Sequence, residues 1–312
     1  MTELIERNDL IAELGNYIKK VEKDFPITMK EKRVPYHAFL DRILNFYFVT
    51  SFVSEKKIVS VDKRLRPLMF LYSKSSLSLF GIYSCLRNGL VSEAAPILRS
   101  LFESLINLEI ILRVNPYQSP FYRMKLYYDY GHVIRWRSLQ ANRNLVKEGK
   151  LTQDKFDSQF KPELISKTEE YFNRVRSNYL DRKGKIKNWN WKIFESELGN
   201  KNPSIVFICS KLGRGVDYLT VYSTVSSLMH SSAIIEHMVS KGNVISLTPK
   251  FSRLIIDIGM VALHYSSEVV RHVINFLDLR SKRALDSFIE SYVDAVLHDL
   301  SLDSFITEQR NK

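Results

Sequence analysis

The stretch Cys85–Arg113, CLRNGLVSEAAPILRSLFESLINLEIILR, carries the clearest helical pattern in the chain. At 100° per residue its apolar side chains fall into two adjacent stripes, so the helix is expected to pack against neighbours on more than one side. The first stripe consists of Ala94, Leu98, Leu101, Leu105, Leu108 and Leu112. The second consists of Ala95, Phe102, Ile106 and Ile110. A helix of this kind predicts a bundle built around it.

Two charged residues, Arg99 and Glu103, interrupt the second stripe one helical turn apart. The periodicity calls for apolar residues at both positions. Because an unpaired buried charge is strongly unfavourable, we expect these side chains to pair or to contact a polar group on another helix.

Helical patterns extend on both sides of this stretch. Arg64–Leu86 has an apolar seam at heptad-like spacing, and Asn88-Gly89 is a helix-stop signal. Because the connection to the central helix is short, the two helices are predicted to form an antiparallel hairpin. Phe251–Phe276 carries charges at three-, four- or seven-residue spacing that predict an ion-pair ladder; they are Arg253, Asp257, His264, Glu268 and Arg271. Further helices are predicted at Asn8–Glu22, His37–Val53, Pro203–Lys211, Val216–Lys241 and from Ser281 onward, with one strand-like piece near Val244–Leu247.

Composition supports an all-α fold. The chain has 312 residues, 45% of them hydrophobic, with only 11 Gly and 9 Pro, which favours long helices over strands and turns. We predict a multi-helix bundle of at least eight helices that carries a basic, aromatic-rich helical insertion. The expected parts are N-terminal helices (1–60), the central hairpin (61–114), the insertion (115–200), core helices completing the bundle (201–280), and a C-terminal helix with a tail (281–312).

The two cysteines and the amino terminus indicate the compartment. Cys85 and Cys209 show no metal-ligand spacing and cannot form a disulfide framework in a chain of this size. The N-terminal residues lack the apolar core of a signal peptide, and the apolar runs are too short to span a bilayer. We therefore expect a cytoplasmic protein without membrane insertion.

Most of the net charge of +12 lies in one quarter of the chain. Ser119–Lys192 contains 17 Lys and Arg against 8 Asp and Glu, with aromatic residues interleaved throughout. This composition predicts binding of nucleic acid, because cations can follow a phosphate backbone and aromatic rings can stack on unpaired bases. Single-stranded RNA is expected to be preferred to duplex DNA. The alternative is a solvated helical surface whose aromatic residues pack on the core. Within its basic sub-segment RKGKIKNWNW, the expected contacts are Arg182, Lys183, Lys185, Lys187, Trp189 and Trp191.

A second unusual face occurs in Val216–Lys241, where small hydroxyls and two imidazoles replace the usual charges. Such a face is typical of a lined cavity or of tight helix packing. Burying it together with Arg99 and Glu103 would let the desolvation penalties offset each other. We therefore expect Arg99 and Glu103 to face the helix that carries His230.

Motifs for well-known chemistries are absent. The chain has no phosphate-binding loop, dinucleotide fingerprint, paired CxxC, HExxH or nucleophile elbow. Glu-x-x-His repeats, which a carboxylate-bridged metal site in a bundle would require, do not occur. No cofactor and no metal are predicted.

The segments LRNGLVSEAAPILRSLFESLINLEIIL and YSTVSSLMHSS resemble an uncharacterised bacterial helical family, domain of unknown function 5677. The resemblance implies that the notable positions are Arg99 and Glu103 on one helix and Tyr222, Ser226 and His230 on a later one. It also implies a setting among bacterial defence genes and a layout similar to the HEPN ribonucleases, which commonly pair. The HEPN signature, Arg followed by four to six residues and then His, is absent, since Arg271-His272 has the wrong spacing.

Two functions follow from these patterns. The first is a defence- or toxin-type effector that cleaves RNA without metal, with His230 as the base, Arg99 holding the phosphorane charge, and Glu103 orienting one of them. The second is a non-enzymatic module that binds nucleic acid or a partner protein from the same operon. In that case Arg99, Glu103, Tyr222 and His230 form a structural network. A homodimer is expected in both cases.

Overall fold

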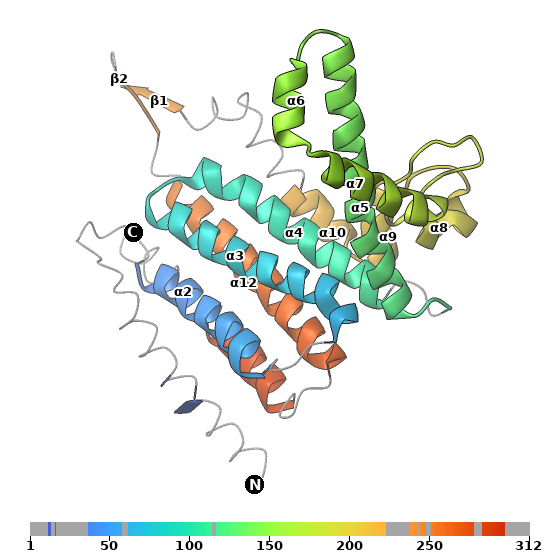
Figure 1. Ribbon diagram of the computed structural model, residues 1–312. Helices are drawn as coiled ribbons and strands as arrows, with labels where there is room; N and C mark the ends of the chain where they lie inside the picture. Colours follow the sequence, from blue (N-terminus) through green and yellow to red (C-terminus); the bar gives the residue numbers. More distant parts are fainter. Residues whose placement is uncertain are drawn as a thin grey trace, which may run out of the picture. The chain divides into compact units, whose positions relative to one another are not determined.

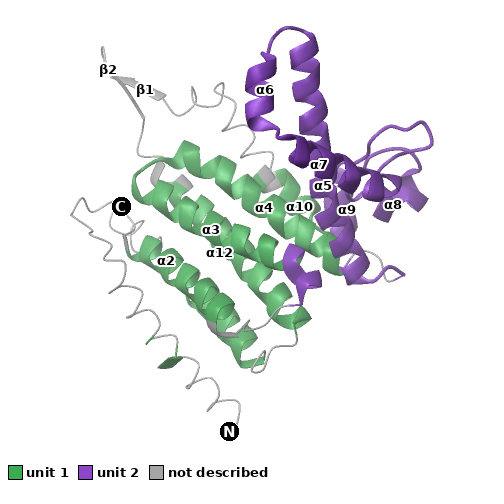
Figure 2. Ribbon diagram, viewed as in Figure 1, with its two compact units in different colours: residues 1–61, 68–112, 213–312 green, residues 62–67, 113–212 purple. Residues whose placement is uncertain are grey.

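The structure is a computed structural model, and it describes residues 12–13, 16, 37–57, 62–113, 117–222, 238–241, 244–247, 251–277 and 283–296. The fold is an all-α multi-helix bundle, which confirms the predicted class. The chain divides into two compact units (Figure 2). Unit 1 comprises Met1–Val61, Leu68–Leu112 and Gly213–Lys312, and unit 2 comprises Asp62–Pro67 and Arg113–Leu212.

Unit 1 is built from long helices that lie along one another (Figure 1). They are α2 (His37–Phe52), α3 (Arg66–Arg87), α4 (Val91–Arg113), α12 (Phe251–Phe276) and a helix over 283–296. Both predicted stripes of α4 are buried, apart from the half-buried Leu112. The ring of Phe102 on α4 lies 5.2 Å from that of Tyr265 on α12.

The hairpin between α3 and α4 forms where it was predicted. The backbone N–H groups of Gly89 and Leu90 donate to the carbonyls of Leu86 and Cys85 at 3.1 and 2.8 Å, and Gly89 adopts a φ of 73°. Glycine favours this left-handed conformation because it has no Cβ. The turn brings Gly81 on α3 against Ile97 on α4.

Helices α2 and α12 approach closely at Gly259. A Cβ built on this glycine would lie 2.6 Å from Cε1 of Phe39 and 2.8 Å from Cδ1 of Ile43, both on α2. Hydrogen at this position therefore allows two bulky side chains to pack directly on the α12 backbone.

The remaining elements of unit 1 are short. They are η1 (Val53–Lys57), α10 (Gly215–Asp217), η4 (Tyr218–Tyr222), and strands β1 (Met238–Lys241) and β2 (Val244–Leu247). The strands pair antiparallel, with Met238 opposite Leu247. This confirms the strand-like piece at Val244–Leu247, but the predicted helix Val216–Lys241 is wrong at its last four residues, which form β1. β-Branched Val239 in β1, and Val244 and Ile245 in β2, favour the strand pair.

Unit 2 is also helical. It contains α5 (Pro120–Lys147), α6 (Gln153–Gln159), α7 (Pro162–Val175), α8 (Trp191–Leu198), α9 (Ile205–Leu212), and the short turns η2 (Lys63–Leu65) and η3 (Arg176–Asn178). Trp136 on α5 stacks on Phe172 on α7 with centroids 4.0 Å apart, and Tyr179 donates to the carbonyl of Leu126 at 2.6 Å. None of the helices in the described part of the chain is long and apolar enough to cross a membrane.

Candidate functional site

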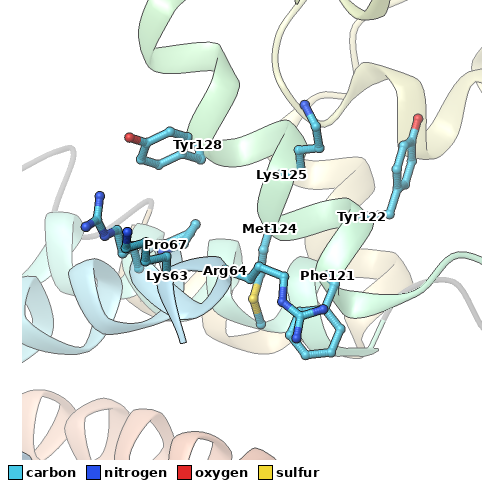
Figure 3. Close-up of a pocket in the computed structure, with 9 residues that line it drawn as sticks. Lys63, Arg64, Pro67, Phe121, Tyr122, Met124, Lys125 and Tyr128 are labelled. Atoms are coloured by element: carbon cyan, nitrogen blue, oxygen red, sulfur yellow. The ribbon is translucent and has the colours of Figure 1, made fainter. Parts of the chain in front are cut away.

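A cavity of about 460 Å³ lies within unit 2, between η2 with the start of α3 and the first turns of α5 (Figure 3). Four cations, three aromatic rings and two other apolar side chains line it. They are Lys63, Arg64, Arg66 and Lys125; Phe121, Tyr122 and Tyr128; and Pro67 and Met124.

Two of the four cations are already neutralised. Arg64 contacts the Asp62 carboxylate at 2.6 Å, and its guanidinium lies 4.8 Å from the ring centroid of Phe121 (Figure 3). Lys125 pairs with Asp129. Lys63 and Arg66, by contrast, form no ion pair with any other residue that the structure describes. Two exposed positive charges in this cavity are therefore available to an anion.

The rings differ in their availability. Figure 3 shows Tyr128 on the same side of α5 as Lys63 and Pro67, whereas Tyr122 points to the other side and Phe121 lies against Arg64. Tyr128 is 50% exposed. Tyr128, Lys63 and Arg66 therefore form a combination of one accessible ring and two unpaired cations, which we call the Tyr128 pocket.

The six residues expected to contact nucleic acid fall into two groups. Arg182, Lys183 and Lys185 are exposed. Lys187, Trp189 and Trp191 are buried, and only 2% of the surface of Trp191 is exposed. The indole N–H of Trp191 donates to the Gly199 carbonyl at 2.7 Å, and Trp189 meets Tyr127 edge-on at 5.0 Å. The two indoles therefore stabilise unit 2 and do not offer free faces to bases.

The basic loop itself is well organised. One carboxylate oxygen of Asp181 accepts the backbone N–H groups of Lys183 and Lys185 at 2.9 and 2.8 Å, and the other lies 3.0 Å from Nζ of Lys187. These contacts hold the pKa of Asp181 below its usual value. Asp181 therefore organises this loop, because its carboxylate accepts backbone N–H groups that have no partner within the turn.

Arg99 and Glu103 pair as expected, with Nε of Arg99 3.1 Å from Oε1 of Glu103. Their side chains are 34% and 41% exposed, so the expected deep burial is wrong. Tyr222 ends η4, and only its backbone is described. Ser226 and His230 lie outside the described residues, and so does the predicted cluster with Arg99 and Glu103.

A different cluster of charges occupies the interior of unit 1. Glu109 on α4 is fully buried, and Arg214, just before α10, donates to both of its carboxylate oxygens at 2.8 and 3.2 Å. Nε2 of His272 on α12 lies 3.0 Å from the same carboxylate. Arg214 also bonds to Glu268 and, at 3.2 Å, to Asp217. We call these five residues the Glu109 cluster.

The electrostatics of the Glu109 cluster favour the ionised pair. Burial alone would raise the pKa of Glu109, but hydrogen bonds from His272 and Arg214 outweigh it and lower this pKa to about 2. Burial disfavours the charged form of Arg214, yet Glu109 and Glu268 raise its pKa above the usual value. Three carboxylates already occupy the guanidinium, so Arg214 is a poor partner for a phosphate, and the cluster joins α4, α10 and α12 within unit 1.

Three members of the predicted ion-pair ladder on α12, His264, Glu268 and Arg271, form ion pairs that the structure describes, and the side chain of Arg253 lies outside the described part of the chain. His264 and Glu268 lie 3.9 Å apart, but Glu268 bonds to Arg214, and Nε of Arg271 contacts Asp286 in the helix over 283–296 at 2.6 Å. Charges on this helix therefore link it to other elements. Among the described residues, no group of three or more His, Cys, Asp or Glu side chains could hold a metal ion.

Comparison with known protein families identifies the family of the chain. The model of a family of unknown function, DUF5677, matches residues 65–244, which is more than half of the sequence. The chain belongs to the DUF5677 family. The DUF5677 match begins at Leu65, just before α3, and ends at Val244, the first residue of β2, so it includes α4 and the basic segment. No curated protein and no solved structure matches the chain.

Proposed function

We propose that this chain binds single-stranded RNA through unit 2, with the Tyr128 pocket as the primary contact. One observation carries the proposal: Lys63 and Arg66, which form no ion pair with another described residue, line the same cavity as the half-exposed ring of Tyr128. Two phosphate-binding cations beside one stacking ring are the elements with which proteins hold single strands.

The charge of the surrounding segment supports RNA as the ligand. The net charge of +9 over Ser119–Lys192 raises the local concentration of polyanions and speeds encounter. A stacking ring needs an unpaired base, because bases in a duplex are covered on both faces. A single strand therefore fits the pocket better than a duplex does.

Fluorescence anisotropy with a labelled oligouridylate tests the proposal. Wild-type protein is expected to bind at low ionic strength and to lose affinity steeply as salt rises. Tyr128→Ala should weaken binding about tenfold, since stacking of one base contributes about 1–3 kcal/mol. Tyr117→Ala is the matched control, because Tyr117 is 96% exposed in the same unit but does not line the cavity.

Two outcomes would contradict this function. If wild-type protein does not bind the oligouridylate at low salt, the basic surface serves another purpose, such as docking of a partner protein. If duplex DNA binds more tightly than the single strand and Tyr128→Ala has no effect, the binding is electrostatic only.

RNA cleavage is a second candidate, favoured by the accessibility of the Arg99–Glu103 pair. A guanidinium that is a third exposed can meet a substrate phosphate, which a fully buried one cannot. In this proposal His230 is the base, and Tyr222 and Ser226 complete the site. His230→Asn should abolish cleavage of labelled RNA in the presence of a chelator without lowering the melting temperature. Unchanged cleavage in this variant would exclude His230 as the base.

A further inference from the structure

A continuous series of ring contacts leads from the Tyr128 pocket across α5 to α7. Tyr128 meets His132 edge-on with centroids 6.0 Å apart, and His132 stacks on Tyr171 at 4.7 Å and 18°. The guanidinium of Arg174 then lies 4.6 Å from the ring centroid of Tyr171. The series begins at a residue that lines the cavity and ends at an exposed cation.

Local sequence spacing explains the series. Tyr128 and His132 lie four residues apart on α5, and Tyr171 and Arg174 lie three apart on α7, so each pair shares one helix face. The two helices are held together by the Trp136–Phe172 stack and by the ion pair of Arg143 with Glu169 at 2.6 Å. The ring contacts are therefore formed between two helices, α5 and α7, that are packed against each other.

The charges around His132 are mostly positive. Burial, followed by the charges of Arg135, Arg174 and Lys125, lowers the pKa of His132, and only Asp129 opposes this. Asp129 is itself paired with Lys125. Arg135 and Arg174 are exposed, and neither forms an ion pair with another residue in the described ranges. Two cations close to His132 are thus left without a carboxylate partner.

We propose that Arg135 and Arg174, the latter held over the ring of Tyr171, form a second subsite for the backbone phosphates of the same RNA strand. This inference rests on the proposed function, because the strand enters the subsite from the Tyr128 pocket. From Tyr128 to Arg135 the axis of α5 advances about 10 Å. Tyr171 is in contact with His132 and with Arg174, so it positions the guanidinium and leaves base stacking to Tyr128.

Oligouridylates of two lengths separate the subsite from the pocket. One of about three nucleotides should occupy the pocket alone, and one of about ten nucleotides should reach both sites. The double variant Arg135→Ala/Arg174→Ala should bind the short probe like wild type. It should bind the long probe more weakly, with the slope of log affinity against log salt reduced by about 1.4, which corresponds to two lost phosphate contacts.

The control is the double variant Arg137→Ala/Arg176→Ala, which removes two exposed arginines of the same unit from outside the series. Melting temperatures of both variants should match the wild type. An unchanged affinity of the first double variant for the long probe, or an equal loss in the control, overturns the subsite while the pocket remains. If wild-type protein binds neither probe, the proposed function fails and the subsite fails with it.

Discussion

Arg214 holds Glu109 through two parallel hydrogen bonds, from Nη2 at 2.8 Å and from Nε at 3.2 Å, across 105 residues of sequence. Glu109 is fully buried on α4, so the pair ties the start of α10 to the central helix. His272 and Glu268 extend the contact to α12. The buried carboxylate therefore links α4, α10 and α12 within unit 1.

Replacing Arg214 with Ala should destabilise the protein by about 3–5 kcal/mol, because it leaves Glu109 buried without its cation. Urea denaturation followed by circular dichroism measures the effect. Arg137→Ala is the control, because Arg137 is exposed and its removal should change stability by less than about 0.5 kcal/mol. Equal stability of the two variants would show that the Glu109 cluster contributes nothing to the fold.

Acid should weaken the fold through Glu109. Its pKa is about 2 in the folded state, below the ordinary value of 4.5. The carboxylate therefore contributes stability fully above pH 4.5, and this contribution, on the order of 3 kcal/mol, is lost as pH falls from 4.5 towards 2. Denaturation midpoints between pH 5 and pH 2.5 should fall more steeply for wild type than for Glu109→Gln. Parallel curves for the two proteins would contradict the lowered pKa.

A side chain at Gly259 should destabilise the fold. A Cβ there would lie 2.6 Å from Phe39, so Gly259→Ala should cost about 1–3 kcal/mol through overpacking between α12 and α2. Gly131→Ala on α5 is the matched control, because a Cβ at that helical position meets nothing within 4 Å. It should stabilise by up to about 1 kcal/mol. If both variants melt alike, the close approach at Gly259 is not tight.

The helices of unit 1 were predictable because their signals are local. The stripes of α4 and the Asn88-Gly89 stop follow from side-chain spacing and turn chemistry. The site was less predictable, because its contacts join distant residues. Arg99 and Glu103 are charges in an apolar stripe, and Glu109 in the run INLEIIL is an equally strong local signal of a buried charge, but its partners Arg214 and His272 lie more than a hundred residues away.

The binding surface shows the same limitation. Basic and aromatic composition pointed to unit 2, but composition cannot tell a buried indole from an exposed one. Lys63 and Arg66 precede the basic segment by more than fifty residues, and only folding brings them into the same cavity as Tyr128. Local patterns therefore identified the segment, and tertiary contacts selected the side chains within it.

Replacement of Trp191 and replacement of the exposed cations of the basic loop should differ in their effect on stability. Trp191→Ala should destabilise unit 2 by about 3–5 kcal/mol, since it removes a buried indole and its hydrogen bond to Gly199. The triple variant Arg182→Ala/Lys183→Ala/Lys185→Ala should keep the melting temperature, because these side chains are exposed. Thermal melts of both variants check this. A stable Trp191→Ala protein would restore the possibility that this indole faces a ligand.

The Tyr128 pocket is tested most directly by the salt dependence of RNA binding in the double variant Lys63→Ala/Arg66→Ala. The control is Lys155→Ala/Lys167→Ala, which removes two exposed lysines of the same unit from outside the cavity. If Lys63 and Arg66 each bind a phosphate, their removal should reduce the slope of log affinity against log salt by about 1.4, and the control should leave it unchanged. Equal slopes in both double variants would contradict the pocket as the RNA-binding site.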